Sequence, residues 1–140
     1  MLIKEIVENL IRKHKTNCPF ALAKALDINV VYENLGETMG YFTNDYRIKF
    51  IHINQRLTQD EPKFTCAHEL AHAVLHPNVN TPFLKRHTLF STDKIERQAN
   101  TFAVELLLPD DLIREHADCG FFNLAKHVGI PDRLVILKQK

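Results

Sequence analysis

Two histidines and a glutamate near the middle of the chain have the spacing of a hydrolytic metal site. In the run His68-Glu69-Leu70-Ala71-His72 the imidazoles are four residues apart, so on a helix they lie nearly above one another and can bind one ion. Glu69 would act as a general base, taking a proton from a metal-bound water and delivering it to the leaving amine. The run therefore predicts metal-assisted hydrolysis of a peptide bond, with Zn2+ as the metal.

A hydrolytic zinc ion usually has three protein ligands and keeps one position for water. Glu96, on a later predicted helix, can supply the third ligand, and Glu105 on the same helix is an alternative. His76, one turn beyond His72, is less suitable because a column of His68, His72 and His76 would span about 12 Å of helix. We interpret His76 as a helix-end residue, where the helix dipole favours a histidine.

Five further residues could assist this site. Asn100, one turn after Glu96, could accept a hydrogen bond from a metal-bound imidazole or steady Glu96, although an ordinary role in satisfying the backbone fits its position equally well. Four possible donors to the tetrahedral intermediate lie in segments expected at the rim of a cleft: Tyr41, Tyr46, Arg86 and His87. The pattern alone does not choose among these four.

The elements that must position these residues follow from the hydrophobic pattern. Apolar residues recur with a spacing of four in several segments, which predicts amphipathic helices. Prolines and capping residues set their ends. The expected helices are residues 2–15 and 20–26, one from Asp60 to Pro77 that carries the histidines, one from Asp93 to Pro109 that carries Glu96, and three short ones at 110–116, 122–127 and 131–137.

A stretch between the second and third helices has strand character. Val30-Val31-Tyr32 is β-branched and aromatic, Asn44-Asp45 is typical of a turn, and residues 46–53 alternate between polar and apolar. We expect about three strands, paired antiparallel because their connections are too short for crossovers. Residues 78–91 are expected to form a loop. The predicted fold is α+β, a small antiparallel sheet packed against helices.

Size and composition set the broad class of the protein. With 140 residues, of which 45% are hydrophobic and 25% charged, we expect a single domain over residues 1–140 that does not need a structural metal. A net charge of +1, without runs of like charge, argues against direct nucleic-acid binding and membrane association. No signal peptide, membrane span or CxxC spacing is visible, so we expect a cytoplasmic protein with free thiols.

Two sequence blocks, residues 63–72 and 96–109, resemble the ImmA/IrrE metallopeptidases. The segment Ile51-His52-Ile53-Asn54 is similar to the strand that enters the site in that family, and the resemblance extends from about Pro19 to Pro131. It implies a compact zincin-like fold. It also implies that the metal ligands are His68, His72 and Glu96, and that the catalytic base is Glu69.

The same resemblance implies a role in regulation, the cleavage of a helix-turn-helix repressor encoded beside the peptidase. Lys63 stands where relatives often have arginine, and no C-terminal sensor domain follows within the 140 residues. We therefore expect a small antirepressor of the phage or mobile-element type rather than an effector-sensing protein.

Two other functions compete with this prediction. One is a non-hydrolytic, metal-containing protein that sequesters a repressor or toxin partner; the intact Glu69 argues against it because a binding module has no need of a base. The other takes residues 123–131 as part of a DNA-binding helix-turn-helix. The overall charge, which is not basic, disfavours that interpretation.

Overall fold

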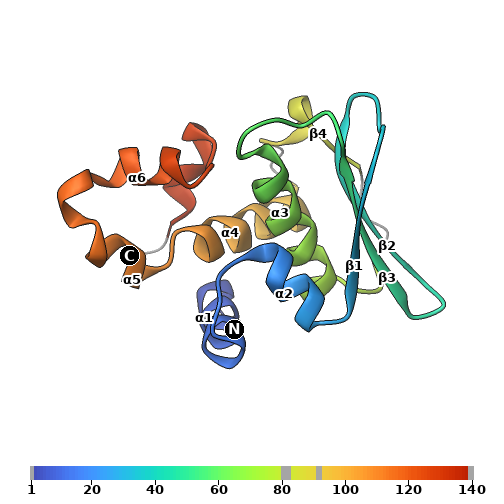
Figure 1. The fold of residues 1–140 in the computed structure, drawn as a ribbon, viewed down its shortest axis with the longest axis horizontal. Coiled ribbons are helices and arrows are strands. Elements are labelled where there is room, and N and C mark those ends of the chain that lie inside the picture. Colours follow the sequence, from blue (N-terminus) through green and yellow to red (C-terminus); the bar gives the residue numbers. More distant parts are fainter. Residues whose placement is uncertain (1, 80–82, 91–92, 139–140) are drawn as a thin grey trace.

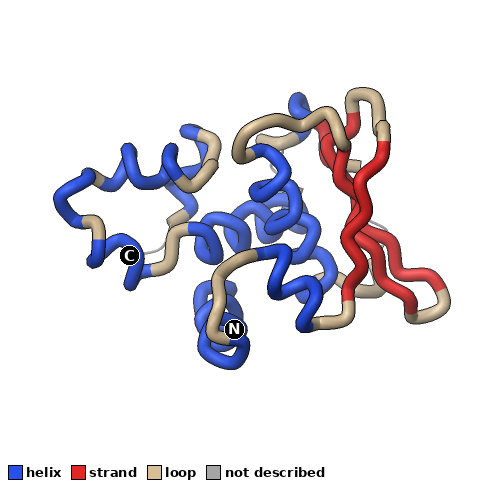
Figure 2. The backbone as a smooth tube through the Cα atoms, in the orientation of Figure 1, coloured by secondary structure: helices blue, strands red, loops and turns tan. Residues whose placement is uncertain are grey.

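The computed structural model describes residues 2–79, 83–90 and 93–138 and confirms an α+β architecture (Figure 1). Helices pack against one face of a small sheet, which forms one side of the molecule (Figure 2). The first elements in chain order are α1 (Ile3–His14), α2 (Pro19–Ala25), β1 (Ile28–Glu33), β2 (Thr38–Asp45), β3 (Ile48–Asn54) and α3 (Glu61–Leu75). They are followed by β4 (Leu84–Lys85), η1 (Arg86–Thr88), α4 (Lys94–Leu107), α5 (Asp110–Glu115), η2 (Ala117–Cys119), α6 (Phe121–His127) and η3 (Asp132–Leu137).

The sheet has four strands in the order β1-β3-β2-β4, one more than the three expected. The additional strand, β4, is short and comes from the segment predicted to be a loop. β2 is antiparallel to β3 and β4, but β1 is parallel to β3, so the prediction of a wholly antiparallel sheet was wrong. Because β3 lies between β1 and β2, residues 34–37 must span two strand spacings, about 10 Å, and four residues are long enough to do so.

The β2–β3 turn lies two residues later than predicted. β2 continues through Asn44 and Asp45, and the turn is formed by Tyr46 and Arg47, which have positive φ values of 53° and 66°. Two consecutive positive φ values suit the twist of a two-residue hairpin, although asparagine and glycine normally occupy such positions. The strand register, which pairs Phe42 with Ile51, therefore overrides the local preference of Asn44-Asp45 for the turn.

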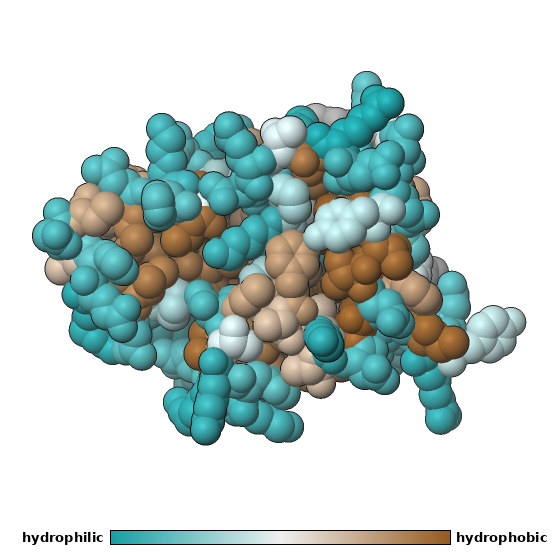
Figure 3. Space-filling model, viewed as in Figure 1, coloured by the Kyte–Doolittle hydropathy of each residue, from teal (hydrophilic) through white to brown (hydrophobic). Residues whose placement is uncertain are grey.

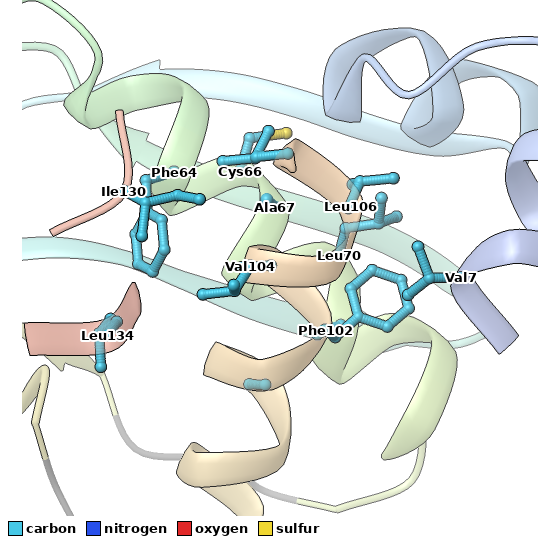
Figure 4. Close-up of a cluster of buried hydrophobic side chains, with 14 of the residues drawn as sticks. Val7, Phe64, Cys66, Ala67, Leu70, Phe102, Val104, Leu106, Ile130 and Leu134 are labelled. Atoms are coloured by element: carbon cyan, nitrogen blue, oxygen red, sulfur yellow. The ribbon is translucent and has the colours of Figure 1, made fainter. Parts of the chain in front are cut away.

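The helices agree closely with the sequence analysis, except that residues 132–137 form a 3-10 helix. α3 is the central element: it contacts α2, β2, β3 and α4, and every residue from Phe64 to Ala73 is buried. Leu70 of α3, Phe102 of α4 and Val7 of α1 belong to one hydrophobic core (Figure 4). α3 and α4 thus carry the two motif blocks inside the molecule, packed directly against each other.

The surface is mostly hydrophilic on the face drawn in Figure 3, with apolar areas over the C-terminal helices and beside the sheet. Among the described residues, no helix is long and apolar enough to span a membrane. The end of the described chain is anchored by Lys138, whose buried ammonium group lies 2.6 Å from Glu105 Oε1 and 2.9 Å from Asp110 Oδ1. These ion pairs tie the C-terminal segment to α4 and α5.

Candidate metal centre

The packing of α3 against α4 brings together the three residues predicted to bind metal. His68 and His72 lie one turn apart on α3, and Glu96 lies in the first turn of α4. The nitrogen or oxygen atoms that they offer are all within 4.8 Å of one another. His68 Nε2 is 3.0 Å from Glu96 Oε1, and His72 Nε2 is 3.1 Å from Glu96 Oε2. All three side chains are buried.

Four buried polar atoms at this cluster have no hydrogen-bond partner among the described residues. They are His72 Nε2, Glu96 Oε2 and both carboxylate oxygens of Glu69. His72 Nε2 and Glu96 Oε2 approach closely, but without hydrogen-bond geometry. Unpaired buried polar atoms are costly, and a divalent cation would satisfy the nitrogen and the carboxylate together. The cluster of two imidazoles and one carboxylate therefore suits a metal ion, with donors of the kind that zinc prefers.

Glu69 and Glu96 have opposite protonation preferences. Burial raises the pKa of Glu69 to about 8; the charge of His72 opposes this rise and that of Glu96 adds to it. Burial also opposes ionisation of Glu96, but the facing imidazoles of His68 and His72 lower its pKa to about 2. Two neighbouring carboxyl groups whose pKa values are shifted in opposite directions are typical of sites where one stays ionised and the other transfers a proton.

Glu69 lies against strand β2 at Gly40. A Cβ atom built on Gly40 would be 3.7 Å from Glu69 Cγ and only 2.6 Å from Thr65 Cγ2. Glycine is therefore needed where β2 crosses α3, because any larger residue would push the strand away from the helix. This close approach positions the backbone of β2 beside Glu69.

Asn100 contacts both an imidazole and a backbone carbonyl, two of the roles considered for it. His68 Nδ1 donates to Asn100 Oδ1 over 2.8 Å, and Asn100 Nδ2 donates to the Leu89 carbonyl over 2.7 Å. The contact with Leu89 could not be expected from the sequence, because residues 78–91 carried no signal beyond that of a loop. Asn100 thereby links a candidate ligand to the segment that follows η1.

For three of the four predicted transition-state donors, the structure gives contacts or exposure that do not involve the cluster. Tyr41 stacks on His52, with ring centroids 4.1 Å apart, and points to the sheet face opposite α3, since its neighbours Gly40 and Phe42 are buried on the helix side. Tyr46 is 99% exposed at the β2–β3 turn. Arg86 forms an ion pair with Glu61. The fourth candidate, the side chain of His87, lies outside the described residues.

The two alternative ligands have other partners. Glu105 is buried against Lys138 rather than near the histidines. His76 is the C-cap residue of α3, as its interpretation as a helix-end residue requires. Its Nδ1 atom also lies 3.1 Å from His72 Nδ1. The spacing of four between these residues was a signal for this contact, but His76 was considered only as a ligand or as a helix-end residue.

Comparisons with known proteins point to a family of peptidases. A peptidase family model described as the IrrE N-terminal-like domain matches residues 23–121, a range that contains both motif blocks. The chain is 50% identical, over 141 residues, to a protein of Bacillus phage phi105 named uncharacterized immunity region protein 2, covering 99% of this chain and 89% of the relative. It is 34% identical, over 115 residues, to metallopeptidase ImmA of Bacillus subtilis, covering 81% of this chain and 67% of the relative.

Proposed function

The chain belongs to the IrrE N-terminal-like family of metallopeptidases, and from this membership we propose that it is a zinc-dependent endopeptidase. The proposed metal ligands are His68, His72 and Glu96, and the proposed general base is Glu69. The observation that carries this proposal is the convergence of three buried ligand atoms beside a second carboxylate whose oxygens have no hydrogen-bond partner among the described residues.

When bound, zinc would supply Lewis acidity and lower the pKa of a coordinated water. Glu69 would accept a proton from the attacking water at a carboxylate oxygen and pass it to the nitrogen of the leaving amine. Burial raises the pKa of Glu69 and so makes its carboxylate a stronger base than that of an exposed glutamate, while the charge of a bound divalent ion would favour the ionised form that accepts the proton. Glu96 would remain ionised as a ligand throughout, since its pKa is about 2.

We propose that an extended substrate peptide pairs with the β4 edge of the sheet. β1 and β4 are the outer strands, and β4 pairs with β2 at Gly40, the residue that lies against Glu69. Addition of a strand supplies backbone hydrogen bonds that tolerate many side chains and holds a peptide straight. His68, Glu69 and His72 are 0% exposed, so substrate binding must open a path to them.

The proposed substrate is a helix-turn-helix repressor encoded beside this protein, which would make the protein a cytoplasmic antirepressor. Two findings support a regulatory role of this type: the resemblance to the phage protein named for an immunity region, and the similarity to a metallopeptidase named ImmA. We further propose that residues 1–140 act as a single metallopeptidase domain, since residues from α1 to η3 contribute to one hydrophobic core.

The substrate can be tested with the neighbouring repressor, purified and mixed with the zinc-loaded protein. We expect mass spectrometry to find new termini at one or a few bonds, and none with Glu69→Gln, which is the matched control because glutamine keeps the size of the side chain. If both proteins relieve repression and neither cuts, the protein sequesters its partner, and the peptidase proposal fails.

A further inference from the structure

A chain of three polar side chains ends at the candidate ligand His72. His72 Nδ1 lies 3.1 Å from His76 Nδ1, and His76 Nε2 lies 2.8 Å from Gln98 Oε1. Two of these residues are at the end of α3, and the third is on α4. The opposite ring nitrogen, His72 Nε2, is the atom that faces Glu96.

The direction of proton donation along this chain decides whether His72 can bind a metal. A glutamine carbonyl oxygen only accepts, so His76 Nε2 carries the hydrogen in its contact with Gln98. In neutral His76 the other nitrogen, Nδ1, is then an acceptor, and His72 Nδ1 must donate to it. This leaves a lone pair on His72 Nε2, at the atom that faces Glu96. The reverse direction would put a hydrogen there and block coordination.

We propose that Gln98 and His76 are positioning residues that hold His72 in the tautomer and ring orientation needed to bind the metal ion. This inference rests on the metal site of the proposed function and adds two residues to it. His76 acts through His72 rather than as a ligand, because both of its ring nitrogens already have partners. Fixing the second nitrogen of a ligand histidine is a general way to orient it.

The two candidate histidine ligands are thus held by one short run of α4. Asn100 accepts directly from His68, whereas Gln98 reaches His72 only through His76. His72 is one helical turn, about 5.4 Å, further along α3 than His68, and His76 occupies the next turn. The run that begins at Glu96 therefore supplies a ligand and orients both of its histidine partners.

The test compares variants that keep or remove the acceptor at each position. His76→Gln and Gln98→Glu retain an acceptor oxygen, whereas His76→Leu and Gln98→Leu do not. The readouts are the zinc dissociation constant, measured by competition with a chromophoric chelator, and the visible spectrum of the cobalt(II)-substituted protein. We expect the leucine variants to bind zinc about 10–100-fold more weakly with an altered cobalt spectrum, and the acceptor-retaining variants to stay within about threefold of the wild type.

Two results would overturn the inference. The first is wild-type zinc affinity and an unchanged cobalt spectrum in the leucine variants. The second is equal loss in His76→Gln and His76→Leu, which would indicate that His76 is itself a ligand or a packing residue. If a leucine variant does not fold, Gln98→Ala replaces it at a half-buried position on α4, with the same expectation.

These measurements need no substrate, so they separate this inference from the peptidase proposal. Weakened zinc binding in the leucine variants, together with a repressor that the zinc-loaded wild type leaves intact, would contradict the proposed activity but not the positioning role. Normal cleavage by the wild type, together with unaltered zinc affinity in the leucine variants, would support the proposed activity and contradict the positioning role.

Discussion

Asn100 holds His68 in one orientation, and its own orientation is fixed by a second hydrogen bond. The Nδ2 group donates to the Leu89 carbonyl over 2.7 Å, so the Oδ1 atom must face His68 Nδ1, 2.8 Å away. An oxygen in that position requires a hydrogen on Nδ1. The His68 Nε2 atom is then directed at Glu96, where the other candidate ligands converge.

Removal of the Asn100 side-chain amide should weaken metal binding. We predict that Asn100→Ala lowers zinc affinity by about 10–100-fold, because His68 loses the partner that orients it. The Leu89 carbonyl also loses its partner, so the free energy of unfolding should fall by about 1–3 kcal/mol. Chelator competition and urea unfolding measure the two effects. Asn123→Ala is the control, because exposed Asn123 donates a local hydrogen bond to the Cys119 carbonyl. An equal loss in both variants would contradict the prediction.

The close approach of β2 to α3 can be tested at Gly40. A Cβ atom there would meet Thr65 Cγ2 at 2.6 Å and the His52 carbonyl oxygen at 2.7 Å. Because one of these atoms belongs to the backbone, the strand must shift, and we predict that Gly40→Ala lowers the free energy of unfolding by about 1–3 kcal/mol. Thermal unfolding measures the change. Wild-type stability in this variant would show that β2 does not lie against α3 as described.

Two of the three cysteines, Cys66 and Cys119, should differ in reactivity. Burial raises the pKa of the Cys66 thiol, and the side chain is fully buried, whereas Cys119 is exposed. Because the thiolate is the reactive form, we predict that Cys119 reacts rapidly with an aromatic disulfide reagent in the native protein and that Cys66 reacts only on unfolding. Cys119→Ser should remove the rapid phase. Rapid labelling of Cys66 in the folded protein would contradict its position on α3.

Acid should selectively weaken the anchor of the C-terminal segment. Hydrogen bonds from Lys138, and then from Lys4, lower the pKa of Asp110 despite its partial burial. A carboxyl whose pKa is lower in the folded state stabilises that state above about pH 4, and the contribution is lost as the pH falls through the folded-state pKa.

We therefore predict that Asp110→Asn lowers the free energy of unfolding by about 1 kcal/mol at pH 7, a modest value because Asp110 is partly exposed. The difference from the wild type should shrink in acid, as the pH falls from about 4, the ordinary aspartate pKa, through the lower folded-state pKa. Urea unfolding at neutral pH and across this acidic range measures it. A difference that does not change with pH would show that the ion pairs of Asp110 do not stabilise the fold.

Local patterns were sufficient for most of the helices and for the pair of candidate histidine ligands. The spacing of His68 and His72 holds on any α-helix, and Pro62 and Pro77 determine where that helix can begin and end. The position of Glu96 beside them depends on the packing of α4 against α3, which the family resemblance implied and which no local rule supplies.

Long-range pairing explains what the sequence could not reveal. The parallel pairing of β1 with β3 depends on which strand occupies the middle of the sheet, and a short connection does not determine that. The sequence does not show which side of β2 faces the helices. In the structure Gly40 and Phe42 are on that side, so Tyr41 lies on the opposite face. The contact of His76 with Gln98 joins residues 22 positions apart and depends on the same helix packing.

The most direct test of the account is the rate of repressor cleavage by the wild type and by Glu69→Gln, each loaded with zinc to the same measured occupancy. Because glutamine cannot accept the proton from the attacking water, we predict that the variant keeps its zinc and cleaves about 100–10,000-fold more slowly. Cleavage by the variant at the wild-type rate, or a repressor left intact by the zinc-loaded wild type, would contradict the account.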